Sequence, residues 1–292
     1  MELRQLKYFT VIAETGGFTE ASRRCYLSQS AISQQIKSLE EELNTTLFVR
    51  TPHKVLLTES GQMLLPLARK VLKDVDNCNV LMSDIHGMLC GELTIGLTAS
   101  LEPYIRKAVA QFVRKYPKVH LRLCYKTIPE LIHMLRSGDL DMAFSIKVEG
   151  EEDWVDSEPI AKYRCCAIMR DTHPLANRDI LTFKALAGQP LILPEEPQGD
   201  QNAIAHFLSK TAPELNVRAV INDPCAILNQ LKITNSISIL SEHSIDGVDD
   251  LRAIPILELL TPFTSYVHTP KNAYRKKAVD TFLREMSSYN LV

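Results

Sequence analysis

The stretch from residue 19 to 43, TEASRRCYLSQSAISQQIKSLEEEL, constrains the fold most, because its spacing predicts two short helices joined by a tight turn. The break falls at Cys25-Tyr26-Leu27, after which Ser28 can cap the second helix with its side-chain oxygen. The stretch is therefore expected to fold as a helix-turn-helix. Four apolar residues recur at helical spacing in the second helix and predict a buried stripe: Ile32, Ile36, Leu39 and Leu43.

The other face of this second helix is polar and carries Ser30, Ser33, Gln34 and Lys37. A helix in the major groove of DNA uses such a face, since Gln and Ser can read base edges while Lys contacts phosphate. An ordinary amphipathic surface helix also has one apolar and one polar face. The stretch alone leaves these two interpretations open.

A two-stranded wing is predicted over residues 47–58, LFVRTPHKVLLT, where two β-prone runs flank a Thr-Pro-His-Lys tip. A helix, a helix-turn-helix and a basic wing in this order predict a winged helix-turn-helix domain over residues 1–58, which favours binding to double-stranded DNA. The candidate DNA-binding residues are polar positions on the second helix and the wing: Ser28, Gln29, Ser30, Ser33, Gln34, Lys37, Arg50, His53 and Lys54.

A long helix is predicted over residues 59–89, with apolar residues in alternating steps of four and three: Leu64, Ala68, Val71, Val75, Cys78, Met82, Ile85 and Leu89. That spacing is typical of a coiled-coil seam, which needs a partner helix to cover it. Packing on the chain's own body is the alternative. We favour a dimer, because helix-turn-helix proteins commonly read paired half-sites. The candidate dimer seam is Val71, Val75, Cys78, Met82 and Ile85.

From Glu92 onward, strand-like runs such as ELTIGLT, VHLRLCY and DMAFSI alternate with helical patterns. This alternation predicts an α/β fold in which helices cover both faces of a parallel sheet. Residues 90–292 suffice for two such lobes of about a hundred residues each. The acidic stretch EGEEDWVDSE is expected to be irregular.

The segments MELRQLKYF, FTEAS, SQSAISQQIKSLEEEL, LFVRT and LLTESG together resemble the N-terminal signature of LysR-type transcriptional regulators. GELTIGL and LRSGDLDMAF are similar to that family's C-terminal domain. The resemblance implies a two-lobed effector domain like a periplasmic solute-binding protein, with lobe 1 at about 90–161 and 267–292 and lobe 2 at about 162–266. It also implies a homotetramer, built as a dimer of dimers, that binds promoter DNA and responds to a small-molecule effector.

An effector is expected beyond the carboxyl ends of the sheet strands, where ligands of open α/β sheets bind. The candidates there are Thr98, Ser100 and Thr127, with Gly199 from the second lobe. Two helix starts near these residues favour an anion such as a carboxylate, whereas Glu195 and Glu196 argue against a strongly anionic effector. Thr127 also has capping-box spacing, so it can serve its own helix as well as a ligand.

Several function classes are disfavoured by the sequence. The N-terminus lacks the apolar core of a signal peptide and no run has membrane-spanning length, which predicts a cytoplasmic protein without a membrane partner. Seven cysteines without Cys-x-x-Cys spacing indicate reduced thiols and no metal site. The net charge of −2 means that a DNA-binding surface must be local. We find no catalytic constellation or phosphate-binding loop, and we expect neither an enzyme nor a cofactor.

Two other classes of protein, and one kind of regulator, are alternatives to this interpretation. A solute-binding protein would fit the C-terminal part alone, but it would explain neither the wing nor the seam. An enzyme with an appended DNA-binding domain would need catalytic residues. Peroxide-sensing members of the LysR family carry a redox cysteine pair in the second lobe, whereas this chain has no cysteine between Cys166 and Cys225.

Overall fold

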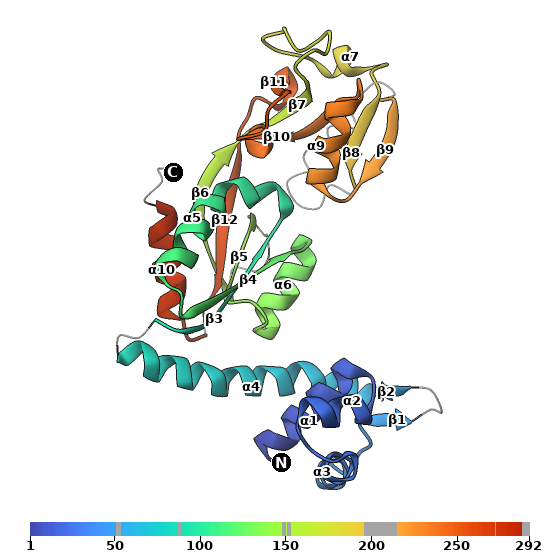
Figure 1. Ribbon diagram of the computed structural model, residues 1–292, viewed down its shortest axis with the longest axis vertical. Helices are drawn as coiled ribbons and strands as arrows, with labels where there is room; N and C mark the ends of the chain where they lie inside the picture. Colours follow the sequence, from blue (N-terminus) through green and yellow to red (C-terminus); the bar gives the residue numbers. More distant parts are fainter. Residues whose placement is uncertain are drawn as a thin grey trace. The chain divides into compact units, whose positions relative to one another are not determined.

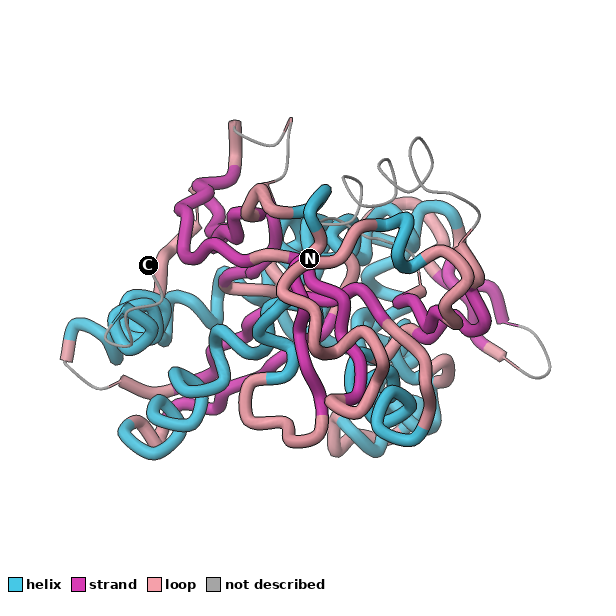
Figure 2. The backbone as a smooth tube through the Cα atoms, turned by 90° about the horizontal axis from the view of Figure 1, so that it is seen from above, coloured by secondary structure: helices cyan, strands magenta, loops and turns pink. Residues whose placement is uncertain are grey.

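The computed structural model describes residues 1–50, 54–86, 89–147, 150, 153–195, 215–271 and 273–287. The chain divides into two compact units, one formed by residues 1–88 with 136–139 and the other by residues 89–135 and 140–292. Figure 1 labels their helices and strands, and Figure 2 shows that the described chain is mostly helix and strand joined by loops.

Three helices and a small antiparallel hairpin surround the apolar core of the first unit. The elements are α1 (Leu3–Thr15), α2 (Phe18–Arg24), α3 (Gln29–Glu42), β1 (Phe48–Arg50) and β2 (Val55–Leu57). α1 ends at Gly16, whose φ of 66° is the left-handed conformation that glycine adopts without strain. Ile32 and Ile36 of α3 are 0% and 1% exposed, so the predicted apolar stripe of this helix faces the core.

α4 (Glu59–Ile85) begins directly after the hairpin. The Oγ1 of Thr58 caps it by accepting a hydrogen bond from the N–H of Gly61 at 3.0 Å. Gly61 lies so close to Leu47 that an added Cβ would be 2.3 Å from the Leu47 carbonyl oxygen. A glycine is therefore required where α4 passes the hairpin.

The apolar stripe of α4 serves two purposes rather than one. Ala68 is 1% exposed in the core of the first unit, and Leu64 packs against the same core. The prediction that the coiled-coil stripe starts at Leu64 is therefore wrong, because its first two positions hold α4 on its own domain. From Val71 to Ile85 the stripe is exposed, reaching 65% at Ile85. The helix ends at Ile85 rather than at residue 89 as predicted, and Leu89 packs against the core of the second unit.

The first lobe of the second unit is built on a five-stranded sheet in the order β4-β3-β5-β12-β6. Its elements are β3 (Gly91–Leu97), η1 (Ala99–Leu101), α5 (Glu102–Lys115), β4 (Val119–Tyr125), α6 (Ile128–Ser137), β5 (Met142–Ile146), β6 (Val155–Tyr163), β12 (Phe263–Pro270) and α10 (Lys277–Ser287). α5 and α10 pack together, with the rings of Phe112 and Phe282 5.4 Å apart. α6 buries Leu131 and Leu135 in a separate cluster with Ala143.

The second lobe contains a three-stranded antiparallel sheet, β10-β7-β11, and the parallel pair β8-β9. Its elements are β7 (Cys165–Arg170), α7 (Phe183–Leu186), β8 (Leu191–Pro194), β9 (Val217–Ile221), α9 (Pro224–Ile233), β10 (Ser238–Ser241), η2 (Glu242–Ile245), β11 (Leu251–Pro255) and η3 (Leu257–Leu259). The chain passes between the lobes at Arg164, from β6 to β7, and again before β12.

Two sequence expectations for this unit are wrong. The five-stranded sheet is mixed rather than parallel, because β12 runs antiparallel to both β5 and β6. The three-stranded sheet is entirely antiparallel, because β7 runs antiparallel to β10 and β11. The acidic stretch expected to be irregular includes the start of β6 at Val155. β6 shows little apolar alternation, since several of its residues are exposed, and pairing with β12 fixes it as a strand.

Candidate nucleic-acid interface and ligand cavity

The start of α3 is fixed by side-chain hydrogen bonds. The Oγ of Ser28 accepts from the N–H of Ala31 at 3.2 Å and lies 3.0 Å from the Oγ of Ser30. The hydroxyl of Thr19 on α2 donates to the side-chain oxygen of Gln29 at 3.3 Å. These contacts hold the first turn of α3 in place while Ser28, Gln29 and Ser30 remain exposed.

The polar face of α3 forms one shallow exposed depression lined by Ser30, Ser33, Gln34, Lys37, Ser38 and Glu41. The four candidate base-reading and phosphate-contacting residues from Ser30 to Lys37 thus share a face, opposite the buried stripe. Lys37 Nζ lies 3.6 Å from a carboxylate oxygen of Glu41, and both side chains are at least two-thirds exposed. Such an exposed pair is weak, so it leaves Lys37 able to contact phosphate.

The wing is tied to α3 by Glu40, a residue that the sequence analysis did not single out. Its Oε1 accepts hydrogen bonds from the backbone N–H groups of Leu47 at 2.7 Å and Phe48 at 3.2 Å. Lys54 is exposed at the start of the second wing strand. The wing tip with His53, and the side chain of Arg50, lie outside the described structure.

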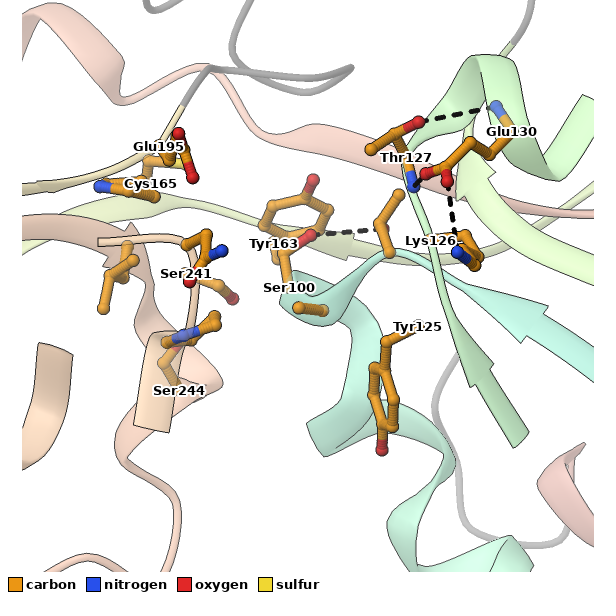
Figure 3. A pocket seen from close by; sticks show the side chains of 16 residues that line it. Ser100, Tyr125, Lys126, Thr127, Glu130, Tyr163, Cys165, Glu195, Ser241 and Ser244 are labelled. Atoms are coloured by element: carbon orange, nitrogen blue, oxygen red, sulfur yellow. Dashed lines mark hydrogen bonds and ion pairs between the residues drawn. The ribbon is translucent and has the colours of Figure 1, made fainter. Parts of the chain in front are cut away.

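A cavity of about 510 Å³ opens where the two lobes meet (Figure 3). It lies at the carboxyl ends of β3 and β4, beside the first turn of α6, and the second lobe contributes the ends of β8 and β10 with η2. Thr98, Ser100 and Thr127 all line it, so the fold brings these three candidates together. Gly199 falls outside the residues that the structure describes.

The N-terminal end of α6 is capped by its own residues, Thr127 and Glu130. The N–H of Thr127 donates to Oε2 of Glu130 at 3.0 Å, and the N–H of Glu130 donates to Oγ1 of Thr127 at 3.4 Å. Lys126 Nζ donates to the same carboxylate at 3.1 Å. The backbone hydrogen bond from Thr127, followed by the side-chain bonds, lowers the pKa of Glu130 to about 2. The expectation that this helix start attracts an anion is therefore unsupported, because Glu130 already occupies that position.

The second-lobe side of the cavity offers hydroxyl groups and one thiol. Ser241, Ser244 and Cys165 lie on one side of it, opposite Thr127 and the other first-lobe residues (Figure 3). Burial raises the pKa of the Cys165 thiol to about 12, so this group is protonated at neutral pH.

Tyr163, on the strand that crosses between the lobes, is 1% exposed and lines the cavity. Its hydroxyl has no hydrogen-bond partner among the described residues. A buried hydroxyl without a partner is unfavourable, which suits a site that receives a ligand. Sequence analysis missed Tyr163, because only the folded crossing places it in the cavity.

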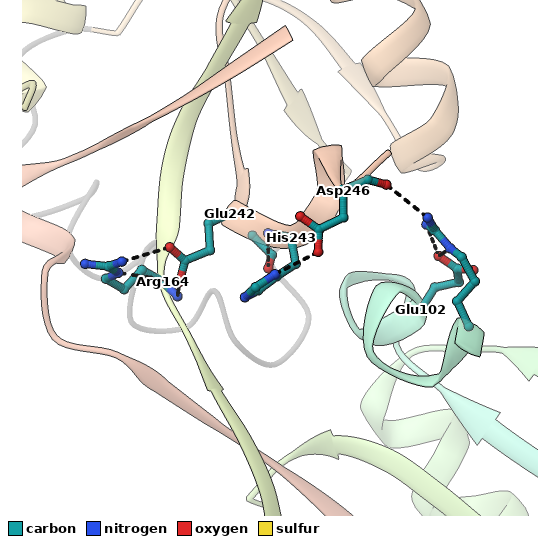
Figure 4. A network of polar contacts seen from close by, with 7 residues as sticks. Glu102, Arg164, Glu242, His243 and Asp246 are labelled. Atoms are coloured by element: carbon teal, nitrogen blue, oxygen red, sulfur yellow. Dashed lines mark hydrogen bonds and ion pairs between the residues drawn. The ribbon is translucent and has the colours of Figure 1, made fainter. Parts of the chain in front are cut away.

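Polar contacts next to the cavity join the lobes (Figure 4). Arg164 at the crossing donates to Glu242 of η2, with Nη2 3.0 Å from Oε2 and the backbone N–H 3.0 Å from Oε1. Arg106 of α5 donates to the carbonyl oxygen of Asp246 at 3.2 Å. Because η2 also carries Ser244 of the cavity wall, these bonds couple the wall to the lobe junction.

The remaining site classes find no support in the described part of the chain. No group of three or more His, Cys, Asp or Glu residues there could hold a metal ion. None of the helices within those residues is long and apolar enough to cross a membrane.

A winged helix-turn-helix followed by a long helix and a two-lobed α/β domain with a cavity defines a class of ligand-responsive DNA-binding regulators. Within that class, residues 3–62 match the family of bacterial regulatory helix-turn-helix proteins of the lysR type, and residues 86–289 match the LysR substrate binding domain. The chain belongs to the LysR family: it is a DNA-binding transcriptional regulator with a substrate-binding effector domain.

Relatives extend over most of the chain. The uncharacterized HTH-type transcriptional regulator YnfL of Escherichia coli strain K12 is 29% identical over 288 residues, which cover 97% of this chain and 96% of the relative. A hydrogen peroxide-inducible genes activator of Pectobacterium carotovorum is 34% identical over 197 residues, 67% of this chain and 65% of the relative. A full-length OxyR variant from Pseudomonas aeruginosa shares the fold, with a TM-score of 0.75 at 22% identity over 98% of this chain and 94% of that chain.

Proposed function

We propose that α3 reads base edges in the major groove and that the wing contacts the phosphate backbone. The observation that carries this proposal is the single exposed polar face of α3, with Ser30, Ser33, Gln34 and Lys37, opposite the apolar stripe that is buried at Ile32, Ile36 and Leu39. The hydrogen bonds of Glu40 to the first wing strand support it, because they keep helix and wing in one arrangement. The protein would act in the cytoplasm as a regulator rather than as an enzyme.

The proposed boundaries are residues 1–58 for DNA binding, 59–89 for the linker that contains α4 and 90–292 for the effector domain. A second copy would cover the exposed stripe of α4, and two such dimers would form the tetramer. The exposed apolar residues from Val71 to Ile85 support this arrangement, since a seam of this spacing is unfavourable in water.

The cavity is proposed to bind a small polar effector without net negative charge. Charged side chains among its described lining residues are Lys126, Glu130 and Glu195, and Lys126 is already paired with Glu130. The remaining carboxylate would repel an anion, while the hydroxyls of Ser100, Ser241 and their neighbours can donate to or accept from a neutral ligand.

The Pectobacterium relative is named as an activator of hydrogen peroxide-inducible genes, and the two buried thiols of the second lobe, Cys165 and Cys166, lack the chemistry for peroxide sensing. Burial raises the pKa values of Cys165 and Cys166 to about 12 and about 11. Oxidation requires a thiolate, and these groups remain protonated thiols at neutral pH.

DNA binding can be tested without knowledge of a target gene. The full-length protein would select duplexes from a random pool, and the enriched duplex would be compared with a scrambled duplex of equal composition. The proposal expects enrichment of two related half-sites and a steep loss of affinity with salt. Absence of any enriched sequence, even at low salt, would contradict it.

The effector proposal can be tested with a thermal-shift screen of small metabolites grouped by charge. A ligand at 100 times its Kd should stabilise the folded protein by about 2.7 kcal/mol. We expect the stabilising compounds to be neutral or cationic and their effect to weaken in Ser100→Ala but not in Ser287→Ala, a control outside this cavity. Stabilisation by dicarboxylates alone, unchanged in Ser100→Ala, would overturn the proposal.

A further inference from the structure

Tyr26 occupies the turn between α2 and α3 in an unusual conformation. Its φ is 53°, in the left-handed region that disfavours side chains larger than those of Gly, Asn or Asp. The residue is 95% exposed, so its ring buries almost nothing that could offset this strain. The folded domain by itself therefore gives no reason for a tyrosine here.

Asn44 provides an internal comparison. It has a φ of 50° in the turn that follows α3, and it is also exposed. Asparagine tolerates this conformation because its short polar side chain can hydrogen-bond locally. The same domain thus uses the expected residue type at one end of α3 and a strained, solvent-exposed aromatic residue at the other. Strained residues with no structural benefit are concentrated at functional sites.

The position of Tyr26 suggests its partner. Tyr26 lies two residues before Ser28, which caps the N-terminal end of α3. This helix carries Ser30 and the other polar residues of the surface that is proposed to face DNA. Residues at the start of a recognition helix lie closest to the groove. Tyrosine hydroxyls are among the groups that donate to DNA phosphates, which fixes the register without reading sequence.

We propose that Tyr26 is a DNA-positioning residue whose hydroxyl donates a hydrogen bond to a phosphate oxygen beside the bases that α3 reads. The proposal rests on the proposed function of α3. The tyrosine is retained for contact with the phosphodiester backbone although the isolated domain would be more stable with asparagine.

The test compares Tyr26→Asn and Tyr26→Phe with the wild type on the selected duplex and on the scrambled duplex, at two salt concentrations. Tyr26→Asn should melt at a higher temperature than the wild type, because it relieves the strain. Both variants should bind both duplexes more weakly by the same factor, roughly 12- to 160-fold per DNA-binding domain, as expected for one hydrogen bond to a charged acceptor. The salt slope should not change, because no charge is lost.

Tyr274→Phe, which removes an exposed tyrosine hydroxyl in the other unit, serves as the matched control and should bind as the wild type does. If the wild type binds and either Tyr26 variant binds equally tightly, the proposal is overturned. If the loss appears on the selected duplex only, Tyr26 reads sequence, and the phosphate contact is likewise refuted. Failure of the wild type to bind any duplex would instead refute the proposed function of α3.

Discussion

The carboxylate of Asp141 and the ammonium of Lys276 form a buried ion pair, with Nζ 2.8 Å from Oδ2 and side chains 8% and 5% exposed. The same Oδ2 accepts the backbone N–H of Thr94 at 2.9 Å, and Nζ also donates to the carbonyl oxygen of Glu92 at 2.8 Å. This cluster joins the start of β5 and the segment before α10 to the first strand of the sheet. It gives a structural role to Asp141, the second aspartate of the LRSGDLDMAF segment.

Replacing Lys276 with Met should destabilise the second unit by about 3–5 kcal/mol, because it leaves a buried carboxylate without its partner. Urea denaturation followed by the fluorescence of Trp154, the chain's single tryptophan, reports on this unit. Lys126→Met, which removes the exposed pair with Glu130, should cost no more than about 1 kcal/mol. Equal losses in the two variants would show that burial does not set the strength of the Asp141 pair.

His268 should make stability depend on pH. It is fully buried, with Nδ1 2.8 Å from the hydroxyl of Ser157 and Nε2 3.0 Å from the carbonyl oxygen of Ile146. Burial lowers the pKa of its imidazole below the ordinary value of 6.5. The unfolded chain then binds a proton at a higher pH than the folded chain does, so the contribution to stability is present above pH 6.5 and is lost as pH falls through the folded-state pKa.

The measurement for His268 is the free energy of unfolding at about pH 7.5 and about pH 5.5. The wild type should lose more stability over this interval than His268→Gln, which has no titrating group at the position. Identical losses in both proteins would show that His268 does not carry the pH dependence.

The exposed stripe of α4 leads to a prediction about assembly. Val75→Lys should place an unpaired charge in the proposed seam and weaken both self-association and DNA binding. Asp76→Lys, one position away and off the stripe, is the matched control for an added lysine. Sedimentation velocity measures the outcome: a Val75→Lys protein that stays as associated as the control would mean that a second copy does not cover this stripe.

The cysteines should differ in reactivity. Cys225 is exposed, whereas Cys165 and Cys166 are buried with raised pKa values. With a disulfide reagent at about pH 8, Cys225 should react first and the buried pair only after unfolding. Mass spectrometry of the labelled peptides identifies each site. Rapid labelling of Cys166 in the folded protein would contradict this prediction and would favour a thiol switch at that residue.

Local sequence signals predicted the parts of the fold that depend on near neighbours. Ser28 caps α3 as expected, because its side-chain oxygen and the backbone N–H of Ala31, from which it accepts, lie only three residues apart. The capping-box spacing of Thr127 likewise anticipated its bonds with Glu130. The family-level fold and function were also confirmed, since long motifs carry them.

Features that join distant segments could not be predicted in this way. The pairing of β6 with β12 connects residues about a hundred positions apart. Neither the antiparallel direction of this pairing nor the existence of β6 follows from the local hydrophobic pattern of the sequence. Tyr163 enters the cavity only through the crossing, and Glu40 meets the backbone of the wing only in the folded domain. The candidate DNA-binding and effector residues remain predictions.

The central claim is that different residues of α3 read bases and contact phosphate. The DNA affinities of Gln34→Ala and Lys37→Ala test this claim most directly. Both would be measured on the selected and the scrambled duplex at two salt concentrations. Gln34→Ala should cost roughly 1–3 kcal/mol on the selected duplex and little on the scrambled one, because Gln can pair bidentately with adenine. Lys37→Ala should weaken both duplexes alike and make the salt slope shallower by about one unit. If Gln34→Ala weakened both duplexes equally, the assignment of base reading to this face of α3 would be contradicted.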